Sequence, residues 1–267
     1  MSSMPSGMEA YCVDSGPVVG RGILFDQLEL DQMVDGSVKD ILLDVTGIEE
    51  LRELLAGVVN TDFEREGLEQ LLSLNDTPPK DWLVGEAIAE AYVAEHCSCF
   101  FPWPTNRDLK NPTASPAGCD LTGFQIVADE VMPARFAFGE VKTSIQKASP
   151  PSVMNSLRGQ MTGLRDTETV KKHLVLYLGR HAKNTDWSPL YRSAAKRYFL
   201  SSDDVAVYGI LIRDILPNSL DLSACVNAMA QDCPLKTDIS VYALYLPEES
   251  IASLPTLVTG SANDEGG

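Results

Sequence analysis

The sequence predicts an α/β protein, with a mixed β-sheet core flanked by helices and an N-terminal α+β extension. Segments with helical periodicity alternate with short apolar runs that are typical of buried strands. A length of 267 residues suits one large domain or a core with an extension. The run Thr77-Pro78-Pro79-Lys80 marks a break between the two. We therefore expect an acidic accessory region over residues 1–79, the core over 80–255 and a disordered tail over 256–267.

The accessory region begins with a polar stretch and continues into two helical patterns. Small polar residues dominate positions 1–17, which we expect to be disordered. Residues 41–58 predict a strand or short strand pair followed by a helix, and residues 63–74 predict a second helix. Each helix has an apolar face, formed by Ile48, Leu51, Leu54 and Leu55 in the first and by Leu68, Leu71 and Leu72 in the second.

The core is expected to begin with a helix and to continue through a pair of strands and a second helix. The expected elements are a helix at 82–95, strands at 120–127 and 135–142, a helix at 152–165, a strand at 173–179, a helix at 187–199, and strands at 204–213 and 238–246. Ser152 is the candidate N-cap of the second helix. The short apolar run at 173–178 is typical of a buried strand.

Charged side chains occupy the pair of strands that follows the first core helix. Asp120 lies in or just before the first of them, and Glu140 and Lys142 are two residues apart on the second. Because side chains alternate between the faces of a strand, Glu140 and Lys142 share one face with Phe136 and Phe138. Carboxylates bind hard divalent cations, and an ammonium group positions a water and offsets phosphate charge. The combination indicates metal-assisted phosphodiester hydrolysis, although each residue alone also fits an exposed ion pair.

The first core helix supplies a third candidate carboxylate. Glu86 lies in its first turn, after Val84-Gly85, and Glu90 follows one turn later as the competing choice. We favour Glu86 because it lies closer to the point where such a helix meets the sheet.

These residues together resemble the motif of the PD-(D/E)xK nuclease superfamily. The resemblance covers residues 82–178 and rests on the helix with Glu86, on Asp120, and on the Glu140-Val141-Lys142 strand. The chain lacks the proline before the aspartate that gives the motif its label. The same order of motifs in a small acidic protein also resembles the nuclease subunits of Hachiman-type anti-phage defence systems.

The resemblance implies a restriction-endonuclease-like core and a DNA endonuclease that depends on Mg²⁺ or Mn²⁺ and leaves 5′-phosphate and 3′-hydroxyl ends. It further implies a helicase partner that restrains or delivers the nuclease. The implied catalytic residues are Asp120, Glu140, Lys142 and Glu86. The implied metal ligands are Asp120, Glu140, Glu86 and the carbonyl oxygen of Val141.

The charge of the chain argues against strong binding to free DNA. The net charge is −17, and it divides into −12 over residues 1–79, +3 over 80–200 and −8 over 201–267. Protein cations drive binding to duplex DNA by releasing counterions, so such an acidic body should bind it poorly alone. We expect DNA engagement to require a partner, or the acidic N-terminal part to hold a basic surface of that partner. The candidate DNA contacts in the basic segment are Arg158, Lys196 and Arg197, and the resemblance adds Gln160. Ordinary solvated side chains explain Arg158 equally well, and a solvated amphipathic helix explains Lys196 and Arg197 better.

Several other classes of protein are disfavoured. No apolar run approaches the length of a membrane span, and the N-terminus does not resemble a secretory signal, so a cytoplasmic protein is expected. Cys97 and Cys99 are spaced too closely for an ordinary zinc site, and free thiols explain them better. The aromatic loop at 100–105 fits packing over the sheet, or contact with bases or a partner. A non-catalytic subunit whose acidic faces bind a basic protein remains the competing interpretation.

Overall fold

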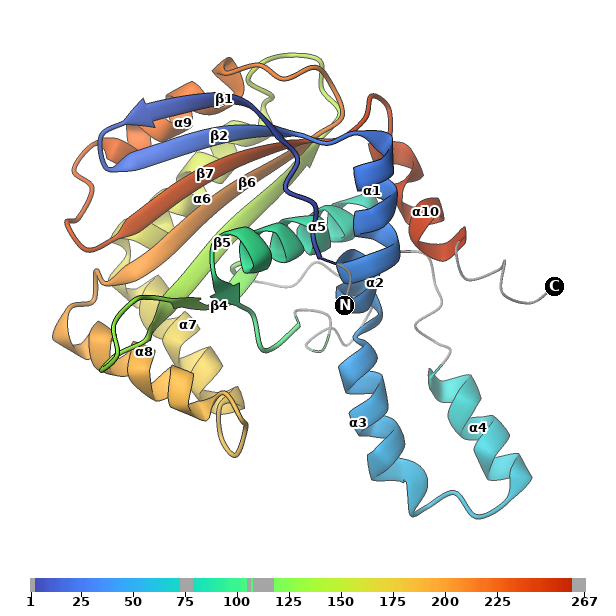
Figure 1. Ribbon diagram of the computed structural model, residues 1–267. Helices are drawn as coiled ribbons and strands as arrows, with labels where there is room; N and C mark the ends of the chain where they lie inside the picture. Colours follow the sequence, from blue (N-terminus) through green and yellow to red (C-terminus); the bar gives the residue numbers. More distant parts are fainter. Residues whose placement is uncertain (1–2, 73–78, 105–106, 108–117, 261–267) are drawn as a thin grey trace.

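A seven-stranded mixed β-sheet lies between two layers of helices, which makes the protein α/β (Figure 1). The computed structural model describes residues 3–72, 79–104, 107 and 118–260. The four central strands are parallel, and the outer pairs are antiparallel. In sheet order the strands are β1 (Met8–Ser15), β2 (Val18–Leu24), β7 (Asp238–Tyr245), β6 (Val205–Arg213), β5 (Ala134–Ser144), β4 (Leu121–Ile126) and β3 (Cys99–Phe100).

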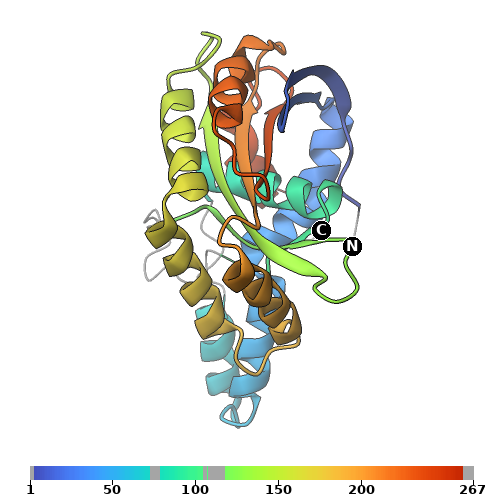
Figure 2. The same cartoon turned by 90° about the vertical axis from the view of Figure 1, so that its left-hand side faces the viewer.

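Helices cover both faces of the sheet, as the view of Figure 2 shows, with α6 and α1 on opposite sides. One face is packed against α1 (Gln27–Met33), η1 (Val34–Val38), α5 (Asp81–His96), η4 (Ile251–Ser253) and α10 (Leu254–Gly260). The other is packed against α6 (Val153–Asp166), α7 (Glu168–His181), α8 (Ser188–Leu200) and α9 (Leu220–Ala230).

The central strand β6 shows why the core divides into two clusters. Every residue of β6 is buried, as expected for a parallel strand covered on both faces. Tyr208 and Ile210 pack in the α5 cluster, whereas Val207 and Leu211 pack in the α6 cluster. Alternation of side chains therefore assigns each residue of the strand to one layer.

Helix α5 lies unusually close to the sheet. A Cβ atom on Gly85 would lie 2.2 Å from the Thr143 hydroxyl oxygen on β5. Glycine at this position therefore sets the distance between the first turns of α5 and the end of β5.

The expectation of disorder over residues 1–17 is wrong, because β1 occupies residues 8–15 of that stretch and forms one edge of the sheet. Its neighbour β2 pairs with β7 from the other end of the chain, with Val18 opposite Ile239. The boundary at residue 79 stays a prediction, but two strands from its N-terminal side belong to the same sheet as the core. Residues 8–15 pair with β2 in a local hairpin, and the strand that joins this hairpin to the sheet, β7, lies more than 200 residues away. Propensity within 1–17 carries no information about that distant strand.

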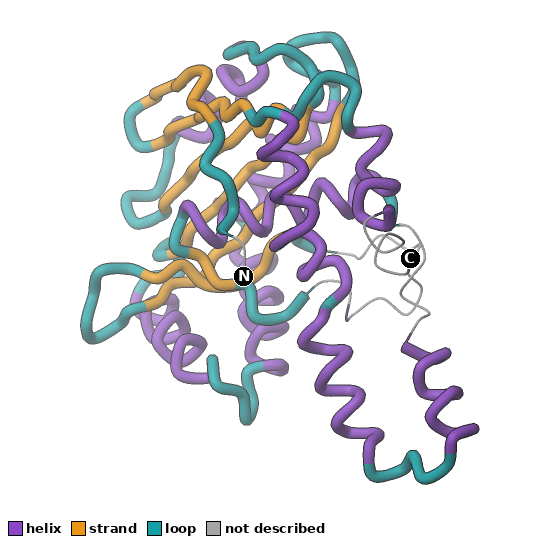
Figure 3. The backbone as a smooth tube through the Cα atoms, turned by 45° about the vertical axis from the view of Figure 1, so that its right-hand side comes forward, coloured by secondary structure: helices purple, strands orange, loops and turns teal. Residues whose placement is uncertain are grey.

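Residues 39–72 are helical, so the strand expected within 41–58 is wrong. Helices α2 (Lys39–Leu43) and α3 (Val45–Ala56) fill that segment, and α4 (Asp62–Leu72) follows. The α3–α4 hairpin projects away from the sheet (Figures 1 and 3). The predicted inward face is wrong for Leu51, Leu54 and Leu71, which are exposed, whereas Leu72 is buried.

The strand expected at 173–179 is also wrong, because this segment lies inside α7. Lys171, Val175 and Leu178 are buried at helical spacing, and Leu176 is exposed. A short apolar run does not separate a strand from a half-buried helix by itself.

The remaining core elements agree with prediction to within one or two residues for α5, β5, α6, α8, β6 and β7. Ser152 does precede α6, but its hydroxyl accepts a hydrogen bond from the Gln146 side chain at 2.8 Å and caps no helix N–H. The tail expected to be disordered from 256 is helical as far as residue 260, where α10 buries Val258; the rest lies outside the described residues. Within the part of the chain that the structure describes, no helix is both long and apolar enough to span a bilayer.

Candidate active site

Asp120, Glu140 and Lys142 converge at the start of β4. The antiparallel register pairs Leu121 with Gly139, which places Asp120 beside Glu140 on the neighbouring strand. The Lys142 ammonium nitrogen lies 3.7 Å from Asp120 Oδ2 and 3.5 Å from Glu140 Oε2. The Val141 backbone N–H donates a 2.7 Å hydrogen bond to Asp120 Oδ2. The three charged groups predicted from the sequence therefore lie together.

The alternation of β5 puts the charged pair on the face expected for it. Phe136 and Phe138 pack in the α6 cluster, and Ala137 and Val141 pack in the α5 cluster. Glu140 and Lys142 continue the phenylalanine series toward the C-terminal end of the strand. The side chains of both are mostly buried, at 5% and 21% exposure.

The Glu140 carboxylate is held in a poorly solvated position. Its Oε2 atom is buried and accepts no hydrogen bond from any described residue. Burial, followed by repulsion from Asp120, raises the pKa of Glu140 well above its ordinary value, although Lys142 partly opposes the shift. The Lys142 ammonium, 3.5 Å away, offsets part of the cost of burying this oxygen, and a cation would offset more of it.

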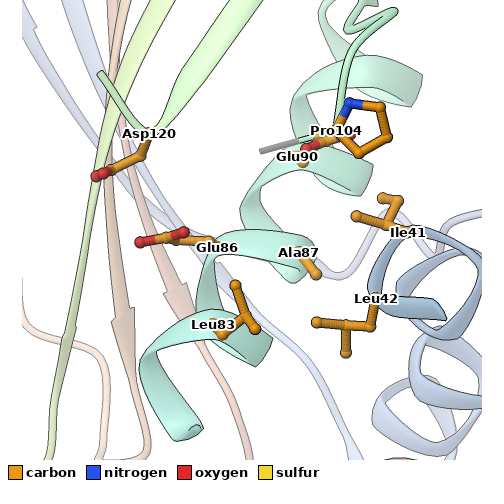
Figure 4. Close-up of a pocket in the computed structure, with 8 residues that line it drawn as sticks. All are labelled: Ile41, Leu42, Leu83, Glu86, Ala87, Glu90, Pro104 and Asp120. Atoms are coloured by element: carbon orange, nitrogen blue, oxygen red, sulfur yellow. The ribbon is translucent and has the colours of Figure 1, made fainter. Parts of the chain in front are cut away.

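Glu86 lies on α5, which covers the face of the sheet opposite to that of Glu140 and Lys142, and it shares a cavity with Asp120. Glu86, Glu90 and Asp120 line one small cavity, and Figure 4 shows the Glu86 side chain directed from α5 toward the strands. Burial, then the charge of Asp120, raises the pKa of Glu86 to about 8. Burial alone raises the pKa of Glu90 to about 8. The charges of Asp120, Lys142 and Glu140 all act on the pKa of Glu86, so of the two choices Glu86 is the more closely coupled to the site.

A second wall of this cavity was not predicted. Ile41 and Leu42 of α2 line it together with Leu83 and Pro104 (Figure 4). The site therefore includes a contribution from the acidic N-terminal region. A helix-forming pattern across residues 39–43, rather than the strand expected there, would have been the signal.

The approach to Asp120 is fixed by its neighbours. Gly118 has φ of +130°, a conformation that favours glycine. The Cys119 thiol lies 3.0 Å from the carbonyl oxygens of Leu121 and Gly139 and so bridges β4 and β5 beside the site. Burial raises the pKa of Cys119, which keeps it a neutral thiol. Its structural position was not predicted.

Two described residues between β3 and β4, Trp103 and Arg107, contact other elements of the fold. Arg107 forms a two-pronged ion pair with Asp44, with N–O distances of 2.7 and 2.8 Å. Its guanidinium also lies 5.1 Å from the centre of the Trp103 ring, and Trp103 stacks on His181 of α7. Of the interpretations offered for the aromatic loop, the packing one therefore applies to Trp103.

The candidate DNA contacts are scattered. Arg158 and Gln160 are exposed on α6. Arg197 is paired with Asp129 and Asp204, at the end of β5 opposite to the candidate site. At 3.3 Å per residue, Ala134 at that end lies about 20 Å along the strand from Glu140. Lys196 is exposed on the same helix. The structure does not bring these four residues together with the carboxylates.

Oxygen donors at the site suit a hard cation. Among the described residues no group of three or more His, Cys, Asp or Glu side chains is close enough to hold a metal ion. A cation would therefore depend on Asp120, Glu140 and a backbone oxygen, with water completing its shell. The Glu140 Oε2 atom has no hydrogen bond from a described residue, and the carboxylates outnumber the single ammonium group. Both features suit a bound cation. Cys97 and Cys99 instead lie 3.3 Å from the hydroxyl oxygens of Tyr242 and Tyr208, as free thiols.

Comparison with known proteins adds no relative. No protein-family model and no curated protein sequence matches this chain.

Proposed function

We propose that this chain is a metal-dependent DNA endonuclease with a restriction-endonuclease-like core, acting in anti-phage defence with a helicase partner. The observation that supports it is the convergence of Lys142 with the carboxylates of Asp120 and Glu140. The resemblance of these residues to the PD-(D/E)xK motif supplies the reaction and the partner. The net charge of −17 agrees with dependence on a partner for DNA engagement.

Each residue of the group has a distinct task in hydrolysis. Lys142 lies between two carboxylates, where its ammonium group offsets charge that develops on the phosphate and orients a water for attack. The Val141 N–H holds the Asp120 carboxylate toward β5. Attack of the water oxygen on phosphorus breaks the bond to the 3′ oxygen, which takes up a proton from solvent water and leaves as a hydroxyl group. The water proton passes to a nearby carboxylate.

The implied cation, Mg²⁺ or Mn²⁺, would be held by Asp120, Glu140 and the Val141 carbonyl, and it would supply Lewis-acid stabilisation of the phosphate. Glu86 would act on the cation through a bound water, because no three carboxylates of the described residues are close enough to hold one ion directly. When all three carboxylates are ionised, Lys142 leaves them with two uncompensated negative charges, which matches a divalent ion.

Plasmid cleavage tests the proposal. Plasmid is incubated with Mg²⁺ or Mn²⁺, with the helicase partner and without it. We expect nicking or linearisation when the partner is present, and a loss of about 10²-fold or more in Glu140→Ala and Lys142→Ala. Glu130→Ala, which changes an exposed carboxylate in the turn between β4 and β5, is the matched control and should retain activity.

Two outcomes would contradict the proposal. Nicking that persists in both Glu140→Ala and Lys142→Ala would show that the activity comes from another site or a contaminant. No cleavage under any metal and partner condition would favour the non-catalytic subunit that binds a basic protein.

A further inference from the structure

The α3–α4 hairpin exposes apolar side chains that nothing in the described structure covers. Leu54, Val58 and Phe63, which we call the hairpin tip, are 75%, 65% and 85% exposed. The hairpin extends away from the sheet and its helical layers (Figures 1 and 3). Exposed leucines scattered singly are ordinary, but three large exposed apolar residues within ten positions, at the turn of one hairpin, are a concentration of the kind used at protein interfaces.

The hairpin is a formed structure rather than a loose excursion of the chain. Arg52 of α3 pairs with Glu69 of α4 at 3.1 Å, which ties the two helices together. The Thr61 backbone N–H donates to Glu64 at 2.8 Å, and the Glu64 N–H donates to the Thr61 hydroxyl at 3.2 Å, so a capping box opens α4. The apolar tip is therefore presented by an ordered turn.

The charge around the tip selects the partner. Residues 45–72 contain seven Asp or Glu and two Arg, a net charge of −5. Both arginines are already paired within the hairpin, Arg52 with Glu69 and Arg65 with Asp62. Glu49, Glu53 and Glu66 form no ion pair with a described residue and remain as the acidic rim. Such a surface repels nucleic acid and a second copy of itself, and attracts a basic protein surface.

The base of the hairpin lies beside the cavity that contains Glu86 and Asp120. Asp44, where α3 begins, receives the two-pronged ion pair of Arg107 from the loop that leads to Asp120. Ile41 and Leu42, just before Asp44, line the cavity that contains Glu86 (Figure 4). An occupant of the tip therefore acts on an element that also forms a wall of the site.

We propose that the hairpin tip, with its acidic rim, is the docking surface for a protein partner that presents apolar side chains among Lys and Arg. Docking would act on the site through α2 and the Asp44–Arg107 pair. The docking surface rests on the proposed function with a protein partner, and it gives that partner a binding place on α3 and α4. Binding is measured without cleavage, so the two proposals can fail separately.

The test uses the full chain and two synthetic amphipathic helical peptides with the same Leu and Phe face. One peptide carries Lys and Arg on its polar face, and the other carries Glu. Fluorescence anisotropy should show salt-sensitive binding of the basic peptide only. Leu54→Ser/Phe63→Ser should weaken it by about 10-fold or more, and Glu49→Gln/Glu53→Gln/Glu66→Gln should weaken it and reduce its salt dependence.

Phe199→Ser/Leu235→Ser provides the matched control, since these side chains are 80% and 104% exposed but lie outside the hairpin. It should bind like the parent protein, and circular dichroism should show all variants equally folded. Four results would overturn the proposal: no binding of the basic peptide, equal binding of both peptides, unchanged binding in the tip variant, or an equal loss in the control. Light scattering that shows self-association lost in the tip variant would also overturn it, in favour of a second copy.

Discussion

The buried carboxyl group of Glu90 should make the stability of this protein depend on pH in a way that one substitution removes. Burial alone raises the pKa of Glu90 from 4.5 to about 8. Glu90 forms no hydrogen bond or ion pair with a described residue, and its surroundings include Ile41, Leu42 and Pro104. The folded protein therefore favours the protonated carboxyl group. In the unfolded chain the same carboxyl group loses its proton near its ordinary pKa.

The sign and size of the effect follow from the difference between the folded and unfolded pKa values. Because the folded-state pKa is raised, the contribution of Glu90 to the free energy of unfolding is fully present below pH 4.5. It is lost as the pH rises through about 8. Each tenfold change in the proton affinity of the carboxyl group corresponds to about 1.4 kcal/mol, so the full difference sets an upper limit of about 5 kcal/mol. Water that enters the cavity would reduce the penalty, and we expect about 2 kcal/mol.

Glu90→Gln removes the charge and keeps the shape of the side chain. We expect urea unfolding to give equal stability for the parent and the variant at about pH 4, and a variant more stable by about 2 kcal/mol at about pH 9. Glu95→Gln, which changes an exposed carboxylate on the same helix, should show no such difference. Equal stabilities at both pH values, or a parent that is the more stable at high pH, would refute the reasoning.

Two further predictions concern contacts that shape the site. Asp44→Ala should destabilise the protein by about 2 kcal/mol, because the Arg107 guanidinium, only 17% exposed, would lose its two-pronged partner. The exposed Arg65–Asp62 pair gives the control, since Arg65→Ala should cost less than about 0.5 kcal/mol by thermal denaturation; equal effects would contradict the prediction. Gly85→Ala should cost about 2 kcal/mol because its new methyl group meets the Thr143 hydroxyl at 2.2 Å. Adding Thr143→Ala should recover most of that loss in chemical denaturation, and a double variant no more stable than Gly85→Ala alone would rule out this contact as the cause.

The local sequence pattern was sufficient to predict the part of the site that lies on the neighbouring strands β4 and β5. Alternation along β5 predicts that Glu140 and Lys142 share a face, and the short connection to β4 brings Asp120 beside them. Both signals act over a few residues or one turn. The fold class of α/β follows from the same alternation of helical and strand-like segments.

Long-range pairing and cavity formation escaped prediction for physical reasons. The pairing of β2 with β7 depends on the register between distant segments, and nothing within residues 18–24 specifies that partner. The walls supplied by Ile41 and Leu42 depend on how α2 packs against α5. At α7 a helical repeat was mistaken for a strand, since the buried positions 171, 175 and 178 have helical spacing.

The parallel pairing of β2 with β7 has a consequence for any attempt to isolate the motif-bearing part of this chain. A fragment trimmed at residue 80 would strip β1 and β2 from the sheet and leave the backbone donors and acceptors of β7 open along that side. Such an open margin invites strand addition by neighbouring molecules in solution, and the fragment would then aggregate. The first two dozen residues therefore protect the long central strands from recruiting strands of other molecules.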